Sequence, residues 1–313
     1  MTVVLITGAN GFVGSNLVRR LVKNRQISVI VRNKSNLWRI KDVLSQLDVH
    51  ILDLSNINKI KKVIRKVKPD TVYHCAAYGI KPNQKDIINI FKNNTLSTLN
   101  LLLALEEYGS LKRLINLGSS FEYGSIPDPI KETDPTRPLT PYGIAKNSQT
   151  QLVQYFANQN RLPAVTLRVF APYGNYEEPR RLVSDIMVSL IKNNRLTIFS
   201  RKARRDFIFV DDVINALIKA ERKKGINGEI FNIGTGIEHT VEDVVKIACE
   251  VTKKDLQILW KDQKQREFDK MGGRGYANIR KAKKIDWKPQ FSLKEGLMKT
   301  YDWYKENINQ YSM

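Results

Sequence analysis

The residues best suited to chemistry are a tyrosine and a lysine four positions apart, within residues 140–146. Thr140 followed by Pro141 is typical of a helix start, so Tyr142 and Lys146 are expected on one face of that helix. A neighbouring ammonium stabilises a phenolate, so we expect Lys146 to lower the pKa of Tyr142 from its ordinary value of about 10. The pair therefore predicts an acid–base tyrosine that works near neutral pH.

A serine pair upstream completes the candidate catalytic set. Residues 114–117 form a short apolar run that is typical of a strand, and Ser119 and Ser120 come just after it. Hydroxyls at the carboxyl end of a parallel strand point into the crevice where ligands bind. We therefore expect Ser119 to hydrogen-bond the same substrate oxygen that Tyr142 protonates.

A glycine-rich loop at residues 7–14 follows the first apolar run and opens a helical pattern, with the spacing G-x-x-G-x-x-G. Gly8 permits a tight turn, Gly11 lets the backbone approach a pyrophosphate, and Gly14 allows close packing of helix on strand. Backbone N–H groups at the helix start would face the phosphates. The loop therefore predicts dinucleotide binding. Its cofactor-binding residues are Gly8, Asn10, Gly11, Phe12, Val13 and Gly14.

The end of the second predicted strand, at residues 27–31, indicates which dinucleotide binds. An acidic residue there would bind the ribose hydroxyl of NAD, but this chain has Arg32, followed by Lys34 and Ser35, with Arg39 a few residues later. Guanidinium and ammonium groups suit a 2′-phosphate, so NADP is favoured and NAD is the alternative. Further cofactor contacts are expected at later strand ends, from Asp53, Leu54, Ala76 and Ala77.

The elements that must position these residues alternate along the first half of the chain. Short apolar runs, read as strands at 3–6, 27–31, 49–52, 71–74, 114–117 and 164–170, are separated by amphipathic helical patterns. This alternation predicts an α/β fold, a Rossmann-type doubly wound parallel sheet with a smaller α+β substrate-binding domain. We expect residues 1–171 to bind the dinucleotide, with 205–235 returning to that domain, and residues 172–204 and 236–313 to bind substrate.

Composition limits the other classes of function. The 313 residues carry 52 Lys and Arg against 31 Asp and Glu, a net charge of +21, which raises the question of nucleic acid. No recognition motif supports nucleic acid, so a non-catalytic NAD(P)-binding or nucleic-acid-binding protein is the weaker alternative. No apolar run approaches the roughly 20 residues that span a bilayer, so we expect a cytoplasmic protein without a membrane segment. Two cysteines and three histidines make a metal centre unexpected.

These motifs together resemble the extended short-chain dehydrogenase/reductase family, the NAD-dependent epimerases and dehydratases that act on nucleotide sugars. The resemblance covers nearly the whole chain. Besides the glycine loop, Ser119 and the Tyr142/Lys146 pair, its motifs are Asp53-Leu54, residues 74–77, Asn94-Thr95 with Thr98, Tyr123-Gly124, Leu167-Arg168, residues 205–207, 210–213 and 232–236. It implies that the first domain binds NAD(P), that the second binds a nucleotide sugar, and that the protein is a homodimer. It also implies cofactor contacts from Asn94, Tyr142 and Lys146.

Departures from the family pattern separate its reaction types. In 4,6-dehydratases an Asp-Glu or Ser-Glu pair follows the catalytic hydroxyl, and its Glu is the base; here Ser120 and Phe121 stand there. Glu122 comes one place late, and a one-residue shift in a strand turns a side chain to the other face, so Glu122 is expected to be structural. The resemblance is closest to reductases of NDP-4-keto-6-deoxyhexoses. A 4-epimerase with tightly bound NAD is the alternative, although epimerases commonly carry Asn at the Ala171 position.

The resemblance also implies where the substrate lies. Arginines suit a diphosphate because guanidinium makes bidentate contacts with phosphate oxygens. The expected substrate-binding residues are Tyr78, Ser119, Ser120, Phe121, Ala171, Arg181, Arg205 and Arg274.

Overall fold

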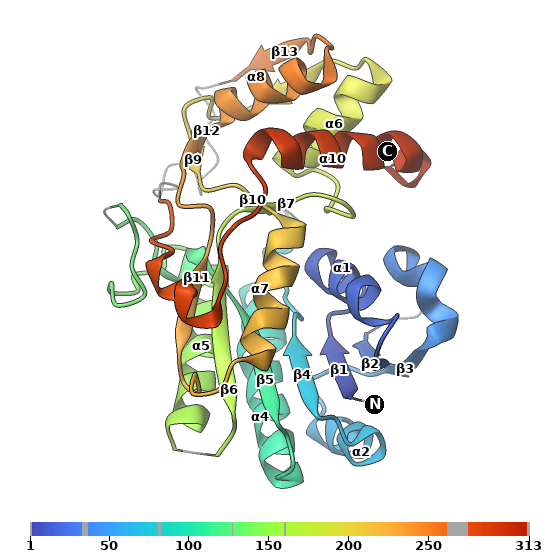
Figure 1. Cartoon of the computed structure of the whole chain (residues 1–313), viewed down its shortest axis with the longest axis vertical. Coiled ribbons are helices and arrows are strands. Elements are labelled where there is room, and N and C mark those ends of the chain that lie inside the picture. Colours follow the sequence, from blue (N-terminus) through green and yellow to red (C-terminus); the bar gives the residue numbers. More distant parts are fainter. Residues whose placement is uncertain are drawn as a thin grey trace.

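The chain folds around a parallel sheet of seven strands, in the order β11-β6-β5-β4-β1-β2-β3 (Figure 1). The computed structural model describes residues 2–32, 37–80, 83–126, 128–159, 161–261 and 275–311. The strands of the sheet are β1 (Val3–Thr7), β2 (Gln26–Val31), β3 (Leu47–Ile51), β4 (Thr71–His74), β5 (Arg113–Ser119), β6 (Ala164–Val169) and β11 (Ile230–Ile233). The chain reverses direction across the sheet between β1 and β4, and ligands bind at such a switch point.

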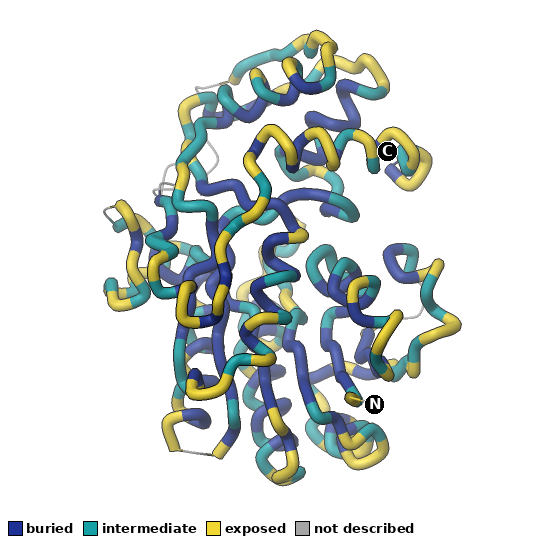
Figure 2. Tube along the Cα trace, viewed as in Figure 1, coloured by how far each residue is buried: buried dark blue, intermediate teal, exposed yellow. Residues whose placement is uncertain are grey.

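Helices cover both faces of the sheet, and each face has its own apolar core. On one face Leu5, Val72 and Leu114 pack with helices α2 (Ile57–Val67), α4 (Ser97–Tyr108) and α5 (Pro141–Asn158). On the other, Val4, Ile6 and Ile115 pack with α1 (Phe12–Leu21) and α7 (Val210–Arg222). Alternate residues of one strand therefore enter different cores, and the central strands are buried throughout (Figure 2).

A smaller α+β layer lies beyond the carboxyl ends of the strands, at the top of Figure 1. Its helices are α6 (Leu182–Lys192), α8 (Val241–Thr252) and α10 (Leu293–Asn307), followed by the short η6 (Ile308–Tyr311). Its two-stranded sheets pair β7 (Pro172–Tyr173) with β10 (Ile208–Phe209), β9 (Arg204–Arg205) with β12 (His239–Thr240), and β8 (Leu196–Ile198) with β13 (Ile258–Trp260). The predicted fold class is thus confirmed: a Rossmann-type doubly wound sheet with a smaller α+β part.

Two stretches expected to be regular α-helix differ. The segment after β2 is a 3₁₀ helix, η2 (Trp38–Gln46), in place of the α-helix that its amphipathic pattern suggests. The helix before β5 begins as α3 (Ile87–Phe91) and passes through a π-helical turn, η3 (Lys92–Leu96), before α4. Short helices η4 (Ser120–Glu122) and η5 (Arg280–Ile285) complete the described elements.

Candidate active site

A cleft of about 1450 Å³ opens between the sheet and the smaller layer. It is lined by all three candidate catalytic residues, by the glycine loop and by most of the residues predicted to bind cofactor or substrate. The predicted residues that line it are Gly8, Asn10, Gly11, Phe12, Val13, Gly14, Arg32, Asp53, Leu54, Ala76, Ala77, Ser119, Ser120, Phe121, Tyr142, Lys146, Ala171, Arg181 and Arg205. Lys34, Ser35 and Arg274 lie outside the described residues.

The glycine loop is packed so closely that side chains would not fit. Gly8 has φ of +69°, and a Cβ there would lie 2.6 Å from the backbone nitrogen of Ala76 at the end of β4. A Cβ on Gly14 would lie 2.2 Å from the carbonyl oxygen of Gly8. Gly11 precedes the first turn of α1, where the helix N–H groups face the cleft without an acidic neighbour. The loop therefore presents backbone donors to an anionic ligand at the cleft floor.

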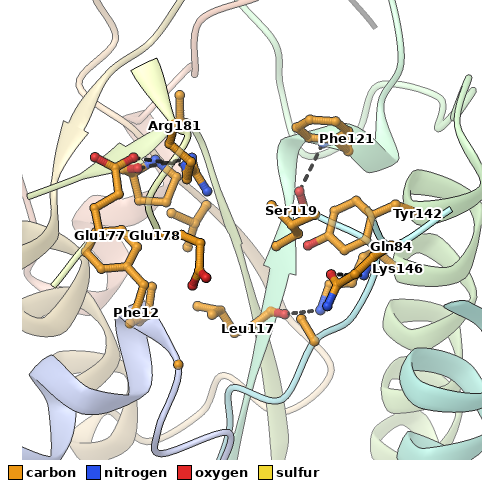
Figure 3. A pocket seen from close by; sticks show the side chains of 18 of the residues that line it. Phe12, Gln84, Leu117, Ser119, Phe121, Tyr142, Lys146, Glu177, Glu178 and Arg181 are labelled. Atoms are coloured by element: carbon orange, nitrogen blue, oxygen red, sulfur yellow. Dashed lines mark hydrogen bonds and ion pairs between the residues drawn. The ribbon is translucent and has the colours of Figure 1, made fainter. Parts of the chain in front are cut away.

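Tyr142 and Ser119 face each other across the cleft wall formed by α5 and the end of β5 (Figure 3). Tyr142 is 8% exposed, and its ring packs edge-on against Phe121 with ring centroids 5.6 Å apart. Burial raises the pKa of the Tyr142 phenol, while its hydrogen bond with Ser119 and the charge of Arg181 act in the opposite direction. Tyr142 therefore keeps its proton at neutral pH.

Lys146 is oriented by uncharged acceptors. Its ammonium donates to the carbonyl of Leu117, at 2.5 Å, and to Oε1 of Gln149 (Figure 3 shows the first contact). Burial lowers the pKa of Lys146 to about 8, although Glu122 and Cys75 raise it. The expected lowering of the Tyr142 pKa by Lys146 is therefore wrong for this structure, because desolvation of the phenolate dominates.

Glu122 is fully buried and is not among the described residues that line the cleft, but it lies in the 3₁₀ helix η4, so the strand register expected for it does not apply. One carboxylate oxygen accepts from the backbone nitrogen of Ser119 at 2.8 Å, and the other accepts from Nε of Arg168 at 2.7 Å. The Ser119 hydroxyl in turn accepts from the backbone nitrogen of Phe121 at 3.3 Å. Glu122 thus fixes the turn that carries Ser119, and its structural role is confirmed.

His74, at the end of β4, bridges two hydroxyls below the cleft. Its ring nitrogens lie 2.7 Å from Oγ1 of Thr7 and 2.8 Å from Oγ1 of Thr98. Burial, reinforced by the charge of Lys146, lowers the pKa of His74 to about 3, so the ring is neutral. His74 ties β1, β4 and α4 together beneath the site.

At the cofactor end of the cleft, Arg32 is exposed and donates to Oδ1 of Asn93 at 2.8 Å. Asp53 lies nearby. Burial raises the pKa of its carboxyl, but hydrogen bonds from Ser55 and the charges of Lys92 and Arg32 outweigh this and lower it overall. The Arg32 guanidinium and the ionised Asp53 carboxylate therefore lie close together where the adenosine end of a dinucleotide is expected.

Asn94, predicted to contact the cofactor, and Tyr78, predicted to contact the substrate, are not among the described residues that line the cleft. Asn94 is fully buried, donates to the carbonyl oxygens of Tyr78 and Ile90, and accepts from the backbone nitrogen of Tyr78 at 3.1 Å. The Tyr78 ring lies beneath the guanidinium of Arg32, 5.6 Å from its central carbon. This placement gives no support to the predicted contact of Asn94 with the cofactor or to that of Tyr78 with the substrate. Asn94 instead fixes the backbone after β4.

Arg39 does not serve as a free cation for a phosphate. Its guanidinium is 3% exposed, donates to the carbonyl of Tyr176 at 2.8 Å and pairs with Glu178 at 2.9 Å. Buried guanidinium needs a partner, and Glu178 supplies it from the loop before α6. Arg39 therefore ties the cofactor part to the smaller layer.

The substrate wall opposite Tyr142 carries Arg181, at the start of α6, whose Nε lies 2.9 Å from Oε1 of Glu177 (Figure 3). Glu177 is 2% exposed, and its Oε2 has no partner among the described residues. Burial raises the pKa of Glu177 to about 7, although Arg181 lowers it. Arg205, on β9, lines the same part of the cleft.

Glu177 should make stability depend on pH. Its folded pKa of about 7 lies above the ordinary 4.5. The stability it contributes is therefore full below pH 4.5 and is lost as pH rises through about 7. We expect the Glu177→Gln variant to lack this loss. The difference in unfolding free energy, variant minus wild type, should therefore rise by about 1–3 kcal/mol between pH 5 and pH 8. Urea unfolding at both pH values measures this. The exposed Glu250→Gln is the control, and parallel pH curves for wild type and Glu177→Gln would rule out the effect.

Sequence reasoning did not find Gln149 or Asn116. Gln149 is three residues after Lys146 on the same helix, so helical spacing was an available signal for its contact with the ammonium. Asn116 lies within the apolar β5, and a buried amide in such a strand needs a partner. Its partner on α5 is set by tertiary packing.

Comparison with known proteins agrees with this geometry. Residues 4–234 match the model of the NAD dependent epimerase/dehydratase family. The chain belongs to this family. The dTDP-glucose 4,6-dehydratase of Shigella flexneri is 27% identical, over 98% of this chain and 93% of that protein.

Two solved epimerases share its fold closely. The UDP-glucuronic acid 4-epimerase of Bacillus cereus, solved with UDP-glucuronic acid and NAD, is 27% identical over 97% of this chain and 99% of its own, with a TM-score of 0.86. The UDP-glucose 4-epimerase of Thermotoga maritima, solved with UDP-glucose, is 27% identical over the same shares, with a TM-score of 0.89. This chain is thus an enzyme of the epimerase/dehydratase type that modifies nucleotide sugars, in a family named for its dependence on NAD.

None of the described helices is long and apolar enough to cross a bilayer. Within the same part of the chain, no group of three or more His, Cys, Asp or Glu side chains is arranged to hold a metal ion.

Proposed function

We propose that this protein reduces the C4 keto group of an NDP-4-keto-6-deoxyhexose, with NADPH as the hydride donor. The observation that carries the proposal is the placement of the Tyr142 phenol beside the hydroxyl of Ser119 at the substrate end of the cleft, with the cation of Arg32 at its cofactor end. A reductase needs a phenol here as the acid that protonates the new alkoxide.

The proposed roles follow from the placement of each group. When bound, the reduced nicotinamide supplies the hydride for C4. Tyr142 donates its proton to the oxygen that becomes negative, and Ser119 hydrogen-bonds the same oxygen and orients it. Lys146 holds the nicotinamide ribose and stabilises the phenolate that remains. Burial of all three side chains keeps bulk water from the reacting carbonyl.

Substrate binding is assigned to both parts of the chain. Ser120, Phe121 and Ala171 are proposed to contact the sugar, and Arg181 and Arg205 the diphosphate, because all of them line the cleft on that side. We propose that the nucleotide sugar is bound chiefly by residues 172–204 and 236–313, together with Arg205, which β9 places in the smaller layer and not in the cofactor domain expected for residues 205–235. A homodimer in the cytoplasm is the proposed working form, as the family resemblance implies.

A 4,6-dehydratase reaction is disfavoured, although the relatives include a 4,6-dehydratase. Phe121 has no group that accepts a proton, and the Glu122 carboxylate is committed to Arg168 and the backbone of Ser119. A 4-epimerase with bound NAD is the second candidate, supported by the epimerases that share this fold. The same serine, tyrosine and lysine would serve it. Ala171 in place of the usual Asn favours the reductase.

Cofactor choice gives a prediction at Arg32. Its exposed guanidinium lies at the end of β2, where it would pair with a 2′-phosphate. We expect Arg32→Glu to weaken NADPH binding about 10- to 100-fold while NADH binding is retained or improved, since the change replaces an attraction worth about 1.4–2.8 kcal/mol. Fluorescence titration with each cofactor measures this. Equal effects on both cofactors would exclude a 2′-phosphate contact.

The proposal is tested on the purified protein with CDP-, GDP-, dTDP- and UDP-linked 4-keto-6-deoxyhexoses. Oxidation of added NADPH, proportional to substrate, is the expected result. Stoichiometric NAD released on denaturation, together with no binding of added NADPH, would favour the epimerase and overturn the reductase.

A further inference from the structure

A chain of buried amides leads from Lys146 into the sheet. The Lys146 ammonium donates to Oε1 of Gln149, and Nε2 of Gln149 donates to Oδ1 of Asn116 at 2.7 Å. Nδ2 of Asn116 donates in turn to Oγ1 of Thr166 on β6, at 3.1 Å. Gln149, Asn116 and Thr166 are at most 1% exposed. The chain therefore joins α5 to β5 and β6 directly beneath the cleft.

The hydrogen bonds leave only one useful orientation for the Gln149 amide. Because Asn116 offers its carbonyl oxygen to Gln149, the NH₂ group of Gln149 must point to Asn116 and its carbonyl must point to Lys146. The reverse orientation would set the carbonyl oxygens of Gln149 and Asn116 against each other and the Gln149 NH₂ group against the ammonium. Asn116 therefore selects the amide orientation that attracts the lysine charge.

Lys146 needs such support because it is 2% exposed and, within the described part of the chain, its ammonium donates to no carboxylate. Several titratable groups face it. Glu122 from η4 favours its charge through space, Cys75 after β4 acts the same way, neutral His74 lies on β4, and Tyr142 is one turn earlier on its own helix. The direct acceptors are the uncharged oxygens of Leu117 and Gln149. A buried ammonium without them would lose its proton more easily.

We propose that Gln149 is a positioning residue: its carbonyl holds the Lys146 ammonium charged and aimed at the end of β5, and Asn116 fixes that carbonyl in place. This deepens the proposed function and rests on it, since Lys146 matters for turnover only if hydride transfer takes place in this cleft. Gln149 itself is not among the described residues that line the cleft.

The direct test is a titration of Lys146 itself, which needs no turnover. Protein carrying ¹³C at the lysine Cε atoms is titrated by NMR, with Lys146→Arg identifying the signal. We expect Gln149→Leu to lower the Lys146 midpoint by about one pH unit, because a hydrogen bond to a charged group is lost. Gln149→Glu should raise it, because a carboxylate replaces the amide oxygen. Gln154→Leu, a change of the same kind further along α5, is the matched control.

Turnover gives the second readout. In Gln149→Leu the alkaline limb of the kcat/KM profile should shift down with the Lys146 midpoint, and Gln149→Glu should shift it up. A Lys146 midpoint in Gln149→Leu equal to that in Gln154→Leu overturns the inference. If Gln149→Leu does not fold, an unshifted midpoint in the near-isosteric Gln149→Glu overturns it. Absence of turnover in wild type would instead count against the proposed function and leave the NMR titration to decide the role of Gln149.

Discussion

Tyr142→Phe should lower kcat by about 10²–10⁴-fold and leave the affinity for cofactor nearly unchanged. The substitution removes only the hydroxyl, so the ring keeps its edge-on contact with Phe121 and its place at the start of α5. Without the phenol, the oxygen formed at C4 keeps the proposed hydrogen bond from Ser119 but loses the acid that protonates it. Single-turnover oxidation of the reduced cofactor measures the first effect, and cofactor fluorescence measures the second.

The control for this variant lies on the same helix. Tyr155 is 53% exposed, and Tyr155→Phe should leave kcat within about twofold of wild type. Ser119→Ala should cause a smaller loss than Tyr142→Phe, since it removes a hydrogen bond and no proton. Turnover by Tyr142→Phe at the rate of Tyr155→Phe would show that Tyr142 is not the acid.

Arg168→Met should have the largest effect on stability among single substitutions near the site. The Arg168 guanidinium pairs with the fully buried Glu122 and lies over the Tyr123 ring, 4.5 Å from its centroid. Removing it leaves a buried carboxylate without its cation, which costs about 3–5 kcal/mol. Urea unfolding measures the change. The turn that carries Ser119 depends on Glu122, so turnover should fall as well.

Two further variants test whether the uncompensated Glu122 charge causes the loss of stability in Arg168→Met. Arg65→Met removes a largely exposed partner of Glu107, and it should change stability little. Arg168→Met combined with Glu122→Gln should recover part of the loss, because the uncompensated charge is gone. An Arg168→Met variant as stable as Arg65→Met would contradict the argument.

The parts of this protein that sequence predicts well are those with local rules. The loop from Thr7 to Gly14 needs glycines because the backbones of Gly8 and Ala76 approach within a side chain's width, and that need leaves a recognisable spacing. The Tyr142/Lys146 spacing works in the same way, because one helical turn brings both to one wall of the cleft. The alternation of strands and helices predicts the sheet for similar reasons.

What sequence could not predict depends on pairs made by tertiary packing. Arg39 was expected to be free for a cofactor phosphate, but it pairs with Glu178, 139 residues away. The Tyr142 pKa was expected to fall because Lys146 is close in sequence. Burial, which no spacing reveals, raises it, and Lys146 is drawn to Leu117 and Gln149. The amide chain through Asn116 has no local signature.

The excess of basic residues also gained a more specific interpretation. Many lysines and arginines are in surface ion pairs, such as Lys61 and Arg65 with Glu107, and Lys281 with Glu229. Arg32, Arg181 and Arg205 line the cleft, where an anionic cofactor and an anionic substrate would meet them.

Transfer of isotope to the sugar tests the central claim most directly. The protein is incubated with a 4-keto-6-deoxyhexose nucleotide and with added NADPH deuterated at both nicotinamide C4 positions, and the product is examined by mass spectrometry and NMR. We expect one deuterium at C4 of the sugar and one oxidised cofactor for each product. An unlabelled product, formed without net oxidation of the added cofactor, would contradict it.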